Sequence, residues 1–174
     1  MGTRHLGAAA AALALLFTAA CSAAEPRAAA PTPSETQPPP TSPSPTLNRE
    51  ATIRAWLKAL VDMQNTGDSG PFTGLSAKSC EYCQKFAQRI NGIYSSGGHA
   101  TAGVMEVVAI HPQAGTGKKK YVVMIDGPGG TMRPSAGAAV QEFIGGPATY
   151  LVGLKKEREK WAVSSADLLP SLQQ

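Results

Sequence analysis

The chain has 174 residues, of which 43% are hydrophobic and only 16% are charged, and its formal net charge is +4. A coiled coil would be much richer in charged residues and leucine, and a polytopic membrane protein would contain several long apolar runs, so both classes are excluded. A net charge this small gives no indication of a nucleic-acid-binding protein, and no nucleic acid is expected among the partners.

The first segment is an N-terminal targeting signal. Arg4 provides a short cationic start, and an apolar run extends from Leu6 to Ala20. A permanent transmembrane helix needs about 20 apolar residues, so this run is too short to be one. Residues 1–20 are therefore predicted to be a secretory signal peptide. The alternative, a buried core helix, is disfavoured because a proline-rich segment follows at once.

The end of this signal, Phe17–Cys21, resembles a bacterial lipobox, with Thr18 where that pattern most often has leucine. The resemblance implies that the thiol of Cys21 receives a diacylglycerol and that the preceding peptide is removed. It also implies a lipoprotein attached to the extracytoplasmic face of the cell membrane. Each buried acyl methylene contributes about 0.8 kcal/mol, so two or three chains anchor a protein permanently. Ordinary secretory cleavage near Ala24 is the alternative.

The next segment is predicted to be a tether. Residues 24–47 hold eight of the fourteen prolines, with serine and threonine between them and no aromatic side chain. Such a composition cannot bury enough apolar surface to offset the entropy of ordering. Residues 21–47 are therefore expected to be disordered and extended, with a reach of at most about 70 Å. The alternative is a recognition or O-glycosylation segment on the same serines and threonines.

Residues 48–174 are predicted to form one domain of ordinary size. Its first helix is expected from Asn48, a suitable N-cap, to Thr66, with Gly67 as the residue that ends it. A short helical turn is expected at 72–75. Apolar residues recur at helical spacing in the first helix, and they are predicted to form its buried stripe: Ile53, Trp56, Leu57, Leu60 and Val61.

A second helix is expected from its N-cap Ser79 to Ser95, and glycines at 97 and 98 end it. After Gly98 the apolar period changes from near four to two, which indicates strands. Five strands are expected, at 104–110, 120–126, 139–144, 148–155 and 161–164. Helices followed by strands favour an α+β fold with an antiparallel sheet.

This order of elements, ending in the hairpin Leu-Val-Gly-Leu-Lys…Lys-Trp-Ala-Val at 151–163, resembles the nuclear-transport-factor-two-like, or cystatin-like, cone fold. The resemblance implies two N-terminal helices packed on a curved antiparallel sheet. More narrowly, the chain resembles a family of uncharacterised lipoproteins of high-GC Gram-positive bacteria, which implies fold and location but no activity. The matching residues are Trp56, Gly67-Asp68, Cys80-Glu-Tyr-Cys83, Tyr94, Gly97-Gly98 and Trp161.

The compartment sets the expectation for the cysteines. If Cys21 is acylated, Cys80 and Cys83 remain as an even pair in an oxidising environment, and a disulfide that locks the first turn of the second helix is predicted. A thiol–disulfide exchange site is the alternative, because a helix N-terminus lowers a thiol pKa. Such sites follow a strand, and none is expected here. A zinc site with His99 and His111 lacks finger-like spacing, so no metal is expected.

Two further motifs are weaker. The stretch Gly115–Lys118 fails as a phosphate-binding loop, which needs glycine at position 112 and serine or threonine at 119, where the chain has Pro112 and Lys119. The basic run Lys118–Lys120 is interpreted either as a solvated turn or as a contact for anionic lipid headgroups or cell-wall polymers.

Some cone folds use a pocket carboxylate with a tyrosine for proton transfer, and the candidates are Glu106, Asp126 and Glu142 with Tyr121 or Tyr150. The alternative is that the strands turn these carboxylates outward. With no Ser-His-Asp set and no cofactor expected, the favoured hypothesis is a non-catalytic lipoprotein that binds a small ligand or an envelope or cell-wall protein. The rival hypotheses are an isomerase or hydrolase with a pocket carboxylate, and a thiol oxidoreductase.

Overall fold

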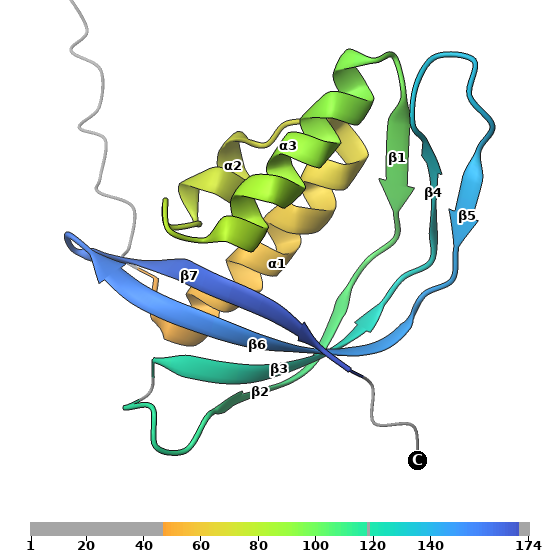
Figure 1. Cartoon of the computed structure of the whole chain (residues 1–174). Coiled ribbons are helices and arrows are strands. Elements are labelled where there is room, and N and C mark those ends of the chain that lie inside the picture. Colours follow the sequence, from red (N-terminus) through yellow and green to blue (C-terminus); the bar gives the residue numbers. More distant parts are fainter. Residues whose placement is uncertain (1–46, 118, 171–174) are drawn as a thin grey trace, which may run out of the picture. The chain divides into compact units, whose positions relative to one another are not determined.

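The computed structural model describes residues 47–117 and 119–170 (Figure 1). The predictions for the signal peptide, Cys21, most of the tether and Lys118 lie outside the described residues. The helices are α1 (Arg49–Thr66), α2 (Gly70–Gly74) and α3 (Glu81–Ser95). The strands are β1 (His99–Ala102), β2 (Glu106–Pro112), β3 (Lys120–Gly127), β4 (Gly130–Arg133), β5 (Gln141–Phe143), β6 (Gly146–Glu157) and β7 (Lys160–Leu169).

Helix α1 begins and ends where its sequence predicts. The Asn48 side chain accepts a hydrogen bond from the backbone N–H of Ala51 at 2.9 Å, which satisfies one of the donors left free at a helix start. At the other end Gly67 has a φ of 76°, and its N–H donates to the carbonyl of Met63. Four of the five predicted stripe residues are fully buried, and Val61 is half-buried.

Helix α3 begins later than expected, and Ser79 is not its N-cap. Cys80 takes that position in an extended conformation, and its sulfur accepts a hydrogen bond from the N–H of Cys83 at 3.3 Å. Ser79 is the better capping residue by type, but the bond between the two cysteines spans the first turn and holds Cys80 at the helix start.

The predicted α+β class and antiparallel pairing are confirmed, but the strands form two sheets. One has the order β1–β4–β5 and the other the order β2–β3–β6–β7. Strands β1 and β4 were not predicted, because His99–Ala102 and Gly130–Arg133 are short and lack alternating large apolar residues. Strand β7 runs to Leu169, well beyond the predicted 164, since it pairs with most of β6.

The core lies between the helices and the inner face of the four-stranded sheet. Figure 1 shows this sheet crossing below the helices while the three-stranded sheet stands beside α1 and α3. Tyr121, Val123 and Ile125 alternate inward along β3 and are buried. Within the described ranges no helix is long and apolar enough to cross a membrane.

Candidate ligand-binding cleft

A cleft lies between the two long helices and the strands that face them. It consists of two adjoining cavities of about 350 Å³ and about 230 Å³, which share the side chains of Gln64, Phe86 and Phe143. The larger cavity lies between α3 and the three-stranded sheet. The smaller one reaches the turn between β5 and β6. The cleft therefore lies where both sheets meet the helices.

Helix α3 provides the aromatic wall of the cleft. Tyr82, Phe86 and Ile90 are four residues apart, so they lie above one another on one face of the helix. The rings of Tyr82 and Phe86 are stacked with centroids 5.8 Å apart. The ring of Tyr150, from β6, meets Tyr82 edge-on with centroids 6.4 Å apart. The rings of Tyr82 and Phe86 are half-buried and Ile90 is buried, so the wall is largely apolar.

The opposite wall depends on close backbone packing. Phe143, the last residue of β5, pairs with Gly130 of β4. A Cβ atom on Gly130 would lie 2.8 Å from Cε2 of the Phe143 ring, a distance at which one of them must move. The missing side chain at position 130 therefore lets the Phe143 ring lie over the strand and line both cavities.

The rim of the cleft is polar. Gln64, Arg89, Gln141 and Glu142 border the larger cavity, and the last three are exposed. Neither Arg89 nor Glu142 belongs to an ion pair within the described part of the chain. An apolar interior with a few polar groups at its edge is the usual composition of a small-molecule site.

Burial raises the pKa of the Tyr82 phenol well above its ordinary value, and the neighbouring Tyr150 raises it further. Partial removal from water disfavours the phenolate, and a second phenol nearby disfavours it again. Tyr82 is therefore a neutral hydroxyl across the physiological pH range. It offers a hydrogen bond but not a charge to whatever enters the cleft.

The structure brings only some of the predicted site residues together. Glu142 and Tyr150 line the cleft, on β5 and β6. Tyr121 is buried in the core. Glu106 and Asp126 are exposed and directly opposite each other in the β2–β3 register, on the face of the sheet that points away from the helices.

Tyr82, Phe86 and Arg89 were not predicted as cleft residues. The sequence contained a signal for the first two, because they are an aromatic pair at positions i and i+4, each one residue before a buried residue of α3, Cys83 or Ala87. That pair widens the apolar face of α3 beyond what its core contact requires. Which cavity the face would line could not be read from its spacing.

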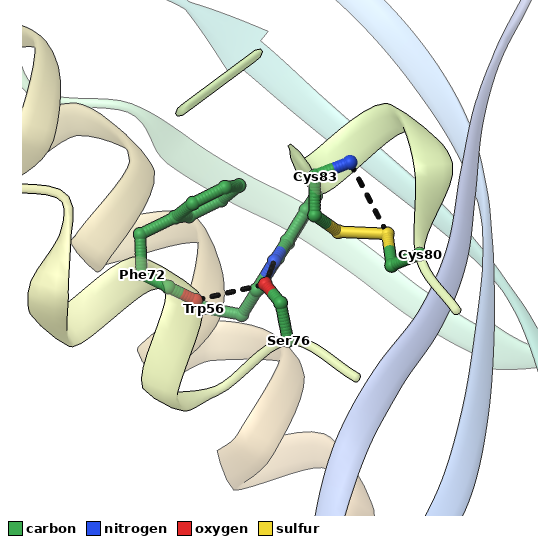
Figure 2. The surroundings of a disulfide bond; sticks show 5 residues. All are labelled: Trp56, Phe72, Ser76, Cys80 and Cys83. Carbon is green, nitrogen blue, oxygen red and sulfur yellow. Dashed lines mark hydrogen bonds between the residues drawn. A yellow bond between two sulfur atoms is a disulfide. The ribbon is translucent and has the colours of Figure 1, made fainter. Parts of the chain in front are cut away.

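The predicted disulfide lies at the opposite end of α3 from Tyr94 and is part of the hydrophobic core. Cys80 and Cys83 are bonded, fully buried and separated by 5.2 Å between their Cα atoms (Figure 2). Beside them, the indole N–H of Trp56 donates to the hydroxyl of Ser76 at 3.0 Å, and that hydroxyl donates to the carbonyl of Phe72 at 2.8 Å. The disulfide therefore lies in a closely packed part of the core and links the first turn of α3 to its N-cap.

This surrounding favours a structural bond over an exchange site. A redox-active cysteine must be reached by a partner thiol, and both sulfurs are covered. The zinc alternative has no geometry to support it, because the bond uses both thiols and the two histidines lie in different sheets, His99 on β1 and His111 on β2. Residues 47–117 and 119–170 contain no cluster of metal-binding side chains.

Three solved structures are similar to this chain. The intermembrane-space region of the chloroplast protein ARC6 is 12% identical with a TM-score of 0.49, over 73% of this chain and 100% of that one. A cystatin-like protein of unknown function from Methylobium petroleophilum is 14% identical with a TM-score of 0.39, over 75% and 82%. One from Nostoc punctiforme is 11% identical with a TM-score of 0.38, over 74% and 98%.

These likenesses concern the course of the backbone alone. No curated protein sequence matches the chain. The sequence profile of DUF6318, described as a family of unknown function, matches residues 27–136, which is more than half of the chain. The chain belongs to the DUF6318 family.

Proposed function

We propose that this chain is a lipid-anchored extracytoplasmic protein of a high-GC Gram-positive bacterium, and that its cleft binds a small molecule without transforming it. The observation that supports binding is the aromatic cleft, whose rim carries Arg89 and Glu142 outside any ion pair of the described residues. A ligand with an apolar body and a polar end matches this lining.

The positions of the carboxylates favour binding over catalysis. A general acid or base must lie within hydrogen-bond reach of the reacting atom. Glu106 and Asp126 are on the outer face of the four-stranded sheet, away from the cleft. Glu142 lies at the rim and is exposed, where it is suited to hold a polar or cationic group of a ligand.

The test of binding uses the anionic probe anilinonaphthalene sulfonate, whose rings fit an apolar cleft and whose sulfonate suits Arg89. We expect a saturable rise in fluorescence. Gln64→Trp places a larger side chain where the two cavities adjoin and should weaken this rise, whereas Gln88→Trp, on the exposed surface of α3, should leave it unchanged. Equal binding by both variants would show that the probe does not enter the cleft.

Arg89→Gln distinguishes the contribution of the charged rim to binding from that of the apolar wall. It should weaken the anionic probe by roughly tenfold, since a charge-assisted contact contributes about 1.5–3 kcal/mol when intact and less at an exposed rim. The neutral dye Nile red should bind as before.

The catalytic alternative has its own test. If the protein chemically changes a member of a pool of envelope small molecules, and Glu142→Ala stops the change, the isomerase or hydrolase hypothesis replaces binding.

The anchor is tested on the processed protein. Mass spectrometry of the product from a lipoprotein-processing host should find an N-terminal peptide that begins at Cys21 and carries acyl chains. A Cys21→Ser variant should leave the membrane fraction. An unmodified thiol at residue 21, or a chain that still begins at Met1, would refute this part of the proposal.

A further inference from the structure

The excess of positive charge in the described residues is concentrated at one end of the domain. The hairpins β2–β3 and β6–β7 reach the same end of the four-stranded sheet, and α1 begins there (Figure 1). We call this region the basic end. Its basic residues are Arg49, Lys119, Lys120, Lys155, Lys156, Arg158 and Lys160. Its acidic residues are Glu50, Glu157 and Glu159.

The basic end therefore has a net charge of +4, from seven basic and three acidic residues. All other described residues together carry six basic and seven acidic side chains, a net charge of −1. This difference in net charge between the basic end and the other described residues is a property of the fold, because the charged residues of the basic end come from three segments far apart in the sequence. A separation of charge this large orients a protein in the field of a charged surface.

Direct contacts hold the three segments together. The N–H of Leu154 donates to the carbonyl of Lys119 at 2.7 Å, which ties the first hairpin to β6. The guanidinium of Arg49 lies 4.2 Å from the centroid of the Trp161 ring, so the start of α1 rests on β7. The cations are thus presented by a packed scaffold and not by separate loops.

Not all of these cations are equally available. Lys155 and Lys156 pair with Glu157 at 2.8 Å and with Glu159 at 3.1 Å. The exposed Lys119, Lys120, Arg158 and Lys160 take part in no ion pair within the ranges that the structure describes. These four can therefore meet an external anion without first losing a partner.

The chain enters the domain at this same end, because residue 47 leads directly into α1. We propose that the basic end docks on the anionic headgroups of the membrane that carries the Cys21 anchor. This inference rests on the proposed function, because the Cys21 anchor is what would keep the domain close to that membrane. Along the chain, the basic end is therefore the part of the domain that joins the tether.

Each basic residue close to an anionic membrane strengthens binding by about fivefold, or about 1 kcal/mol. Three such residues therefore change the ratio of docked to undocked protein by roughly a hundredfold. The attraction falls off within a Debye length, which is about 8 Å at physiological ionic strength and about 3 Å at 1 M salt. Docking should accordingly be lost at high salt.

Trp161 provides an intrinsic probe, since it is half-buried at the basic end while Trp56 is fully buried in the core. The full chain, purified from a lipoprotein-processing host, is reconstituted into vesicles of phosphatidylcholine alone or mixed with phosphatidylglycerol. Both contain lipids with a nitroxide on the headgroup. We expect stronger quenching in the anionic vesicles, and no such difference for Trp161→Phe.

The charge test compares two triple variants. Lys119→Gln, Lys120→Gln and Lys160→Gln together should reduce quenching in anionic vesicles to the level seen in neutral ones. The matched control, Arg54→Gln, Lys58→Gln and Lys85→Gln, removes the same charge from exposed helix positions and should retain the quenching. Near-ultraviolet circular dichroism checks that both variants are folded.

Flotation of the same samples separates this inference from the proposed anchor. Flotation with both vesicle types, but equal quenching in both, supports the anchor and overturns docking. Flotation with anionic vesicles only supports docking and overturns the anchor, whereas flotation with neither overturns both. Equal quenching combined with retention on immobilised polyphosphate also overturns docking, in favour of an anionic cell-wall polymer.

Discussion

Gly67 and Tyr94 form a contact that the stability of the domain should report. Gly67 ends α1 with a φ of 76°, and a Cβ atom at this position would lie 2.6 Å from Cγ of the Tyr94 ring. Favourable carbon contacts are about 3.5–4.0 Å, so the ring would have to move by about 1 Å. The Tyr94 hydroxyl donates to the carbonyl of Gln64 at 2.9 Å, and that hydrogen bond would be lost or stretched.

The cost of Gly67→Ala has two parts. The left-handed conformation costs a residue with a side chain about 1–2 kcal/mol. Overpacking against Tyr94 costs a further 1–3 kcal/mol or so. We therefore expect the free energy of unfolding to fall by roughly 2–5 kcal/mol. In a Tyr94→Ala background only the first part remains, so the coupling between the two sites should be about 1–3 kcal/mol.

Urea unfolding, followed by far-ultraviolet circular dichroism, measures these values. Gly92→Ala is the matched control, because Gly92 lies inside α3 with open space around its Cα, and alanine there should stabilise by about 0.5–1 kcal/mol. If Gly67→Ala and Gly92→Ala change stability by the same amount, the close packing of Tyr94 on the end of α1 is wrong.

Three other predictions concern the core and the cleft. Replacing Cys80 and Cys83 by serine should lower the free energy of unfolding by about 2 kcal/mol, the chain-entropy value for so short a loop, and dithiothreitol should then have no further effect in the urea titration. Ser76→Ala leaves the buried indole N–H of Trp56 without its acceptor and should cost about 1–3 kcal/mol, with a changed near-ultraviolet spectrum; an unchanged midpoint would contradict that hydrogen bond. Tyr82 should stay protonated in an ultraviolet titration through pH 11. Because its folded pKa exceeds its unfolded value near 10, its contribution to stability is complete below pH 10 and is lost as the pH rises above it. Tyr82→Phe should flatten this alkaline loss, and equal slopes for both proteins would refute the burial effect.

Local sequence signals predicted the elements that carry a strong periodic pattern. The cap at Asn48, the buried stripe of α1 and the left-handed Gly67 were all confirmed. The pattern failed for β1 and β4, whose residues are small or polar. These two strands are held by pairing with each other and, for β4, with β5, and such long-range pairing leaves no periodic trace in a short segment.

The sequence likewise predicted only some of the residues that line the cleft. Glu142 interrupts an apolar strand and Tyr150 is a candidate through the resemblance to cone folds, and both line the cavities. Glu106 interrupts an apolar strand as Glu142 does, yet it lies with Asp126 on the outer face. Strand alternation tells that two residues share a face, but the identity of the buried face depends on which side the helices cover.

The two long helices and the cysteine pair followed from the sequence alone, because each depends on residues within a few positions of one another, and the succession of helices and then strands indicated the antiparallel class. The division into two sheets, the aromatic cleft and the basic end were decided by the tertiary structure. All three join segments that are distant along the chain, and the free energy of such contacts depends on the complete packed arrangement and not on the composition of any one segment.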